Sequence, residues 1–140
     1  MSRFARFPLC LAAALALAAT GQPAYASPPP GIDGMIWINP FNSVKVRTEQ
    51  CGESLCGRVV WATPGAEEEA REGGTARLVG TELLQDYRPS GPGRWSGHVF
   101  VPDMGHRFSS TLELQGGGKL KVSGCILAGL VCKSQIWRRA

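Results

Sequence analysis

The sequence predicts an all-β protein, a small antiparallel β-barrel of about eight short strands, on three observations. Strand-like segments recur with glycine- and proline-rich turns at about eight- to twelve-residue intervals. No amphipathic segment is longer than about two helical turns. The part of the 140-residue chain that follows a predicted export signal suits one domain with a modest core. We therefore expect residues 27–140 to form a single β-barrel domain.

Residues 1–26 are predicted to be a signal peptide. Two arginines precede an apolar run at Leu9–Ala19, which is too short to span about 30 Å of hydrocarbon. Ala-Tyr-Ala at 24–26 predicts cleavage before Ser27. An uncleaved anchoring helix is the alternative. We expect a periplasmic or secreted protein with no membrane span in the mature chain, since no later segment is apolar enough.

The first expected strands are Met35–Asn39, Val44–Gln50 and Leu55–Ala62. Pro40 ends the first strand, because proline cannot continue a hydrogen-bonded ladder. The second strand alternates, with Val44, Val46 and Thr48 on one face and charged residues on the other. Residues 52–54, Gly-Glu-Ser, suit a hairpin turn between the second and third strands.

The middle of the chain is expected to be irregular. Residues 63–76 combine glutamates with glycines and predict a long surface loop, with one helical turn at Ala66–Arg71. Ala76–Leu84 has no clear period and is open to interpretation as a strand or a short helix. Residues 90–93, Ser-Gly-Pro-Gly, predict a turn.

The second half predicts four further strands, which are Arg94–Val101, His106–Leu114, Leu120–Cys125 and Lys133–Arg138. A turn at 102–105 and three glycines at 116–118 separate the first three of them. The second of these strands alternates, with Phe108, Ser110 and Leu112 on one side.

Four cysteines remain after the signal peptide, which contains Cys10. An even set behind an export signal predicts disulfides. We favour Cys51–Cys56 and Cys125–Cys132, each closing a hairpin and stabilising by roughly 2 kcal/mol, against about 4 for a bridge between the two regions. Crossed pairing stays open, because a barrel brings early and late strands together. The wide spacing and oxidising compartment argue against redox catalysis and zinc binding.

The charge balance bears on the partners. The formal net charge is +4, and loss of the two arginines of the signal peptide lowers it to +2, so no nucleic-acid partner is expected. Residues 119–139 hold five basic residues and no acidic one. That stretch is either a solvated strand face or a contact for an anionic ligand or envelope surface. No cofactor is expected, because Gly116–Gly118 joins two strands and is no phosphate loop.

Two motifs carry a family resemblance. They are C-G-x-x-L-C-G at 51–57 and C-x-S-Q-x-W-x-R at 132–139. With them the chain resembles the bacterial family called domain of unknown function 2147, small exported proteins, over nearly all of residues 27–140. Two features depart from the family pattern: Met35 replaces a glycine, and residues 63–76 lack an acidic Asn-Pro-Asp segment. The resemblance implies a fold and export but no activity.

A more distant likeness is to the lipocalin-type barrels. These pair an early tryptophan with an arginine on the last strand, which Trp37 and Arg139 (or Arg138) could repeat. A guanidinium stacked on an indole contributes about 1 kcal/mol. The likeness concerns the fold and implies no function.

Binding is the expected function. The candidate ligand is a small apolar or amphiphilic molecule in the barrel mouth, or else an envelope protein or surface. An eight-stranded barrel has room for side chains or for one small ligand. The candidate binding residues are four tryptophans and one polar residue of the C-terminal motif: Trp37, Trp61, Trp95, Gln135 and Trp137. Core packing is the alternative role of the tryptophans, and a solid structural or interaction protein is the alternative function.

We expect no catalytic or metal site, but an enzyme is a further alternative. His98 and His106 flank a turn that contains Asp103, and their even spacing predicts that both point the same way. Such a trio could bind a metal or act as acid and base in hydrolysis. The pattern has low specificity, and exposed polar residues on a hairpin explain it equally. No Gly-x-Ser-x-Gly nucleophile motif is present.

Overall fold

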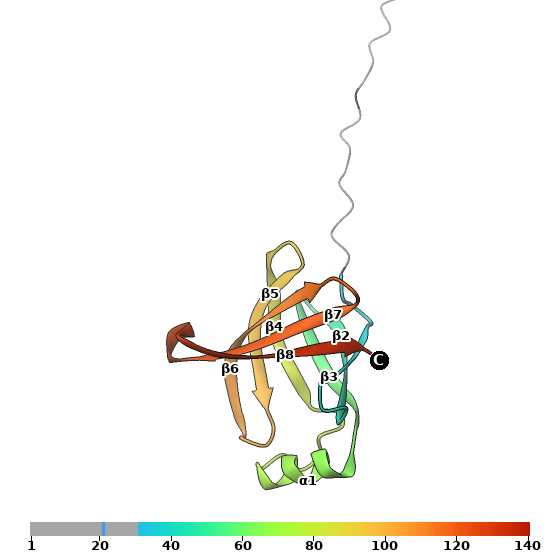
Figure 1. Ribbon diagram of the computed structural model, residues 1–140, viewed down its shortest axis with the longest axis vertical. Coiled ribbons are helices and arrows are strands. Elements are labelled where there is room, and N and C mark those ends of the chain that lie inside the picture. Colours follow the sequence, from blue (N-terminus) through green and yellow to red (C-terminus); the bar gives the residue numbers. More distant parts are fainter. Residues whose placement is uncertain (1–20, 22–30) are drawn as a thin grey trace, which may run out of the picture.

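The computed structural model describes Gly21 and residues 31–140; the predicted signal peptide and its cleavage site lie outside residues 31–140. Eight antiparallel strands form a closed barrel in which each pairs with its neighbours in sequence and β8 returns to β1 (Figure 1). This confirms the predicted all-β barrel. The elements are β1 (Ile36–Ile38), β2 (Val44–Cys51), β3 (Ser54–Ala62), α1 (Pro64–Glu72), β4 (Glu82–Gly91), β5 (Arg94–Val101), β6 (His106–Gln115), β7 (Lys119–Ile126), η1 (Leu127–Gly129) and β8 (Val131–Arg139).

The up-and-down strand order places alternate connections at opposite ends of the barrel. Four connections gather at one end, here called the open end: 39–43, 63–81, 102–105 and 127–130. The tight turns at 52–53, 92–93 and 116–118 lie at the other, closed end. Figure 1 shows α1 below the barrel and the β4–β5 hairpin at the opposite end.

Helix α1 is longer than the single turn that the sequence predicts. Thr63 caps it, accepting a hydrogen bond at Oγ1 from the backbone N–H of Ala66 (3.2 Å), and Pro64 starts the first turn. Ala66 and Ala70 are buried against the barrel. After the helix, Gly73 packs so tightly on the 102–103 turn that no larger side chain fits without displacing it. The helix is therefore fixed over the open end.

Strand β4 lies later in the chain than the ambiguous segment 76–84 suggests. Residues 76–81 are irregular, and pairing with β3 is irregular as well. The strand has a bulge between Gln85 and Arg88, and Asp86 adopts a left-handed backbone conformation (φ 56°). A bulge disrupts the two-residue alternation, so this strand has no clear period in the sequence.

The core is one hydrophobic cluster inside the barrel. Its largest fully buried side chains include Trp37, Tyr87, Leu84, Leu112 and Leu120. The indole N–H of Trp37 donates to Thr48 Oγ1 (3.1 Å), and the Thr48 hydroxyl donates in turn to the carbonyl of Ile32.

The chain closes the barrel with a short seam. Strand β1 pairs with β8 at Trp37–Arg139 and Ile38–Arg138. The Arg139 guanidinium carbon lies 5.9 Å from the centroid of the Trp37 ring, which is the contact expected from the lipocalin likeness. Within residues 31–140, the stretch Val131–Trp137 of β8 pairs with β7 but has no strand on its other side.

Two disulfides cross hairpins. One joins Cys51 to Cys56 between β2 and β3, and the other joins Cys125 to Cys132 between β7 and β8. These are the two favoured pairs, so neither bridge crosses the barrel.

Candidate functional site

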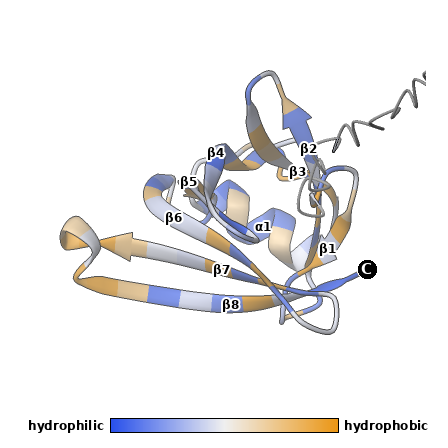
Figure 2. Cartoon of the chain, turned by 90° about the horizontal axis from the view of Figure 1, so that it is seen from above, coloured by the Kyte–Doolittle hydropathy of each residue, from blue (hydrophilic) through white to orange (hydrophobic). Residues whose placement is uncertain are grey.

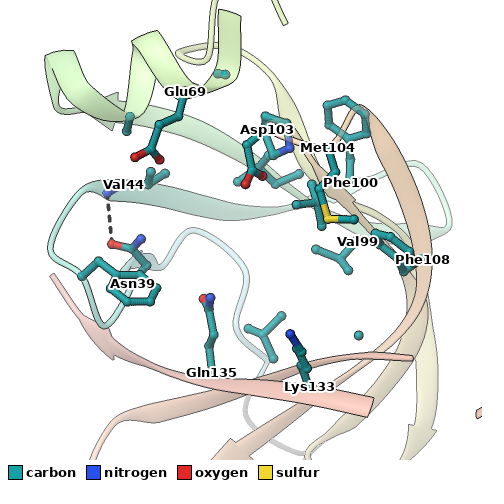
Figure 3. A pocket seen from close by; sticks show the side chains of 18 of the residues that line it. Asn39, Val44, Glu69, Val99, Phe100, Asp103, Met104, Phe108, Lys133 and Gln135 are labelled. Carbon is teal, nitrogen blue, oxygen red and sulfur yellow. Dashed lines mark hydrogen bonds between the residues drawn. The ribbon is translucent and has the colours of Figure 1, made fainter. Parts of the chain in front are cut away.

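A cavity of about 530 Å³ opens at the open end of the barrel. It lies between α1, the 39–43 connection, the β5–β6 turn and the unpaired stretch of β8 (Figure 3). Its volume falls in the range of about 300–1,000 Å³ typical of small-molecule sites. Most of its wall is apolar, with contributions from Val44, Leu83, Val99, Phe108, Val122 and Trp137.

Six polar side chains also line the cavity: Asn39, Ser43, Glu69, Asp103, Lys133 and Gln135. Figure 3 shows Lys133 and Gln135 extending from β8 toward the side on which Glu69 and Asp103 lie. Asn39 is held by its own connection, because its Oδ1 accepts from the backbone N–H groups of Ser43 (2.8 Å) and Val44 (3.1 Å). No carboxylate of the described chain forms an ion pair with Lys133.

The register of β8 explains why these two side chains share a face. Lys133, Gln135 and Trp137 alternate along the strand and pair with Gly124, Val122 and Leu120 of β7. The indole N–H of Trp137 donates to Gln135 Oε1 (2.9 Å). Since this bond fixes the amide oxygen, the amide NH₂ group of Gln135 is left for the cavity.

The five predicted binding residues lie in different places. Gln135 and Trp137 line the cavity. Trp37 is fully buried in the core and is not among the residues of the cavity wall. Trp95 is half-buried and packs against the core cluster. Trp61 is 42% exposed on the surface of the molecule.

The exposed position of Trp61 has a local explanation. Lys45 on the neighbouring strand places its Nζ 5.2 Å from the centroid of the indole. The two side chains form a surface cation–π pair, and neither residue lines the cavity.

The sequence analysis missed Lys133, Glu69 and Asn39 as wall residues. Lys133 had a usable signal, because it precedes Gln135 and Trp137 at two-residue spacing on one predicted strand. Asn39 and Glu69 reach the site through a loop and a helix, whose placement follows from tertiary packing and has no local pattern.

The predicted histidine pair does not share a face, so that prediction is wrong. His98 pairs with Ser109, whereas His106 pairs with Val101, and these two registers put the histidines on opposite faces of the β5–β6 hairpin. The four-residue turn between the strands changes the alternation, so even spacing along the chain does not carry across it. Asp103 lines the cavity, and His106 is exposed. His98 Nδ1 is buried without a partner among the described residues.

A buried polar pair lies on the inner face of the sheet. Burial raises the pKa of Tyr87, and the nearby Ser110 hydroxyl opposes that rise. Neither hydroxyl has a partner at hydrogen-bond geometry within the described part of the chain. Gly97 lies between their strands, and its missing side chain leaves the space that the Tyr87 ring occupies.

A carboxylate of α1 organises the loop that follows the helix. Glu67 accepts hydrogen bonds from the backbone N–H groups of Leu78 (2.8 Å) and Val79 (3.1 Å). These bonds, with help from Arg71 and Arg77, hold the pKa of Glu67 below its usual range. Since Leu78 lines the cavity, this contact shapes the wall beneath the helix.

Comparison with known proteins places the fold. The chain is similar to protein HP1028 of Helicobacter pylori, described as belonging to the lipocalin family, with a TM-score of 0.60 and 14% sequence identity. The match covers 79% of this chain and 83% of that one. At this identity the likeness concerns the barrel alone. No curated protein matches the chain. None of the helices in residues 31–140 is long and apolar enough to cross a membrane.

The family assignment extends over almost the whole barrel. Residues 36–139 match the family described as an uncharacterized protein conserved in bacteria, domain of unknown function 2147. The match covers every strand from β1 to β8 and both disulfides. The chain belongs to this bacterial family.

Proposed function

We propose that the protein binds a small amphiphilic molecule in the cavity at the open end, after export from the cytoplasm. One observation carries the proposal: an apolar cavity of about 530 Å³ has on one wall a lysine and an amide NH₂ group that have no partner among residues 31–140. Apolar pockets with a few convergent polar groups are typical of ligand sites. The lipocalin-like barrel supports the proposal as a scaffold that can hold one small ligand.

The arrangement favours a ligand with an apolar body and an anionic or hydrogen-bond-accepting head. Lys133 offers a positive charge, and Gln135 offers amide hydrogens, so both would bind an acceptor oxygen. Glu69 and Asp103 on the opposite side disfavour a second anionic group there. A ligand negative at one end and apolar elsewhere fits both sides.

The two other candidate functions receive less support. A solid structural barrel does not agree with a cavity of this volume. The hydrolytic or metal-binding trio required His98 and His106 on one face, and the register separates them.

Native mass spectrometry of protein isolated from the exporting cell tests the binding. We expect adducts above the mass of residues 27–140, whose intact mass also tests the predicted cleavage site and the loss of four hydrogens to two disulfides. Lys133→Met should reduce adduct occupancy of an anionic amphiphile, whereas Lys119→Met, at the closed end, should leave it unchanged. Equal occupancy in both variants would contradict the assigned role of Lys133.

A cavity-filling variant tests the location. Val99→Phe places a larger side chain in the cavity wall and should remove the adduct while the protein keeps its circular dichroism spectrum. A folded Val99→Phe protein that carries the same adduct would show that the ligand binds elsewhere and would refute the proposal.

A further inference from the structure

The tip of the β7–β8 hairpin is the most exposed apolar part of the described chain. Its six residues, Ile126–Val131, have no polar side chain. Leu130 is 84% exposed and Leu127 is 67% exposed, and Ile126 and Val131 are each 46% exposed. Figure 2 shows the hairpin reaching beyond the rest of the barrel and ending in hydrophobic residues. A contiguous exposed apolar patch of this kind marks an interaction surface.

The backbone of the tip is costly for the residues that it contains. Leu127 and Ala128 adopt left-handed conformations (φ 52° and 55°), which asparagine and glycine populate more readily. Hairpin turns with this backbone normally carry those polar or small residues. Leucine at such a position therefore indicates that its exposed side chain has a role in surface contacts, since it does not favour the turn conformation. The Cys125–Cys132 disulfide holds the base of the tip together.

One cation lies close behind the tip. Of the five basic residues after residue 114, four lie five or more positions from the tip along β7 and β8, toward the closed end: Lys119, Lys121, Arg138 and Arg139. Lys133 lies two residues behind Val131, which is roughly 7 Å along an extended strand. An anionic surface that received the tip would therefore meet a cation close behind it.

The tip lies at the same end of the barrel as the cavity. Ile126 and Val131 form its base and also line the cavity. Two further exposed apolar residues line the cavity from other connections of the open end: Phe41, 72% exposed, and Met104, 56% exposed. Exposed apolar side chains thus lie on the hairpin and on two other connections of the open end.

We propose that the Ile126–Val131 tip inserts into the interfacial region of an anionic lipid bilayer. A bilayer fits better than a protein partner, because the tip has no aromatic, arginine or hydrogen-bonding side chain of the kind that centres protein interfaces. Aliphatic side chains with a flanking cation are sufficient for an anionic interface. The proposal goes beyond the cavity ligand and does not depend on it.

Vesicle co-sedimentation tests the proposal. The exported protein is used after its N-terminus has been checked by mass, because an uncleaved Leu9–Ala19 run could itself bind lipid. We expect binding to phosphatidylglycerol-containing vesicles, weaker binding to pure phosphatidylcholine, and a decrease with salt. The Leu127→Ser/Leu130→Ser variant should lower the partition coefficient by roughly tenfold or more. A Val79→Ser/Ile136→Ser control, which changes exposed apolar residues away from the tip, should bind as the wild type does.

A second measurement reports the insertion directly. Leu130→Trp adds a fluorophore at the tip, and its emission should shift to the blue and be quenched by brominated lipids. An unchanged emission of the added tryptophan on vesicles would overturn the proposal, as would equal partitioning of the tip variant and the wild type. If the tip variant instead converts a dimer to a monomer in native mass spectrometry without lipid, the tip binds a second copy and the bilayer assignment fails. Cavity adducts are measured separately, so loss of vesicle binding with adducts retained refutes only this proposal.

Discussion

Replacing Gly97 by alanine should destabilise the barrel strongly. A Cβ atom at this position would lie 2.7 Å from the carbonyl oxygen of Gln85 and 2.8 Å from both Cα and Cγ of Tyr87. Ordinary contacts between carbon atoms are about 3.5–4.0 Å, so the new atom overlaps its carbon neighbours by roughly 0.7 Å or more. Two of the three atoms belong to the backbone of β4 and cannot rotate away. We expect a cost near the upper end of the usual range for overpacking, about 3 kcal/mol.

Urea unfolding of the oxidised protein, followed by tryptophan fluorescence, measures this cost. With a denaturant slope of about 1.5 kcal/mol/M, the midpoint should fall by about 2 M. Gly124→Ala is the matched control, because it also lies on the inner face of the sheet but its Cβ would meet Val99 Cγ1 at 3.4 Å. That variant should equal or exceed the wild type, since alanine reduces the entropy of the unfolded chain. A Gly97→Ala midpoint within about 0.3 M of the wild type would refute the packing argument.

Three further variants test individual contacts. Glu67→Gln should lower the free energy of unfolding at neutral pH, whereas Glu68→Gln should not. Because folding lowers the pKa of Glu67, its carboxylate stabilises the fold above the unfolded pKa of about 4.3, and this stabilisation is lost as the pH falls below that value. Acid unfolding of the two variants and the wild type measures the difference. Tyr87→Phe should be as stable as the wild type at pH 7 and more stable above about pH 10. Folding raises the pKa of the Tyr87 phenol, so above the unfolded pKa of about 10 the wild type loses stability that phenylalanine does not lose. Parallel alkaline unfolding curves would contradict this. Thr48→Val leaves the indole N–H of Trp37 unpaired and should cost about 1–3 kcal/mol in urea unfolding, a loss that Thr48→Ser should largely avoid.

Much of the barrel could be predicted from the sequence because its strands are locally consistent. Arg94–Val101 is a strand with the predicted bounds, and the predicted glycine turn at 116–118 joins β6 to β7. Strand β4 could not be placed in the same way. Its bulge and the left-handed Asp86 interrupt the alternation, and the partners that stabilise it lie on β3 and β5.

The candidate site was less predictable than the fold. Gln135 and Trp137 were accessible to sequence reasoning because they belong to a specific motif on a single strand. The cavity also needs α1 at the open end, and the helix is held there by the contact of Gly73 with a turn about thirty residues away. The faces of His98 and His106 were predicted wrongly because the alternation of one strand was continued across a turn into the next. The face of a residue after a turn depends on the strand register, which the sequence does not show.

The locality of the two sulfur bridges has a consequence for how the chain matures. Each joins cysteines only five or seven positions apart. With the export proposed above, each pair could form as soon as its own hairpin has emerged, because neither cysteine has to wait for a distant partner. An oxidant without an isomerase should therefore be sufficient to produce both bonds. The final step, in which β8 meets β1, needs no covalent bond and can follow once the whole chain is present.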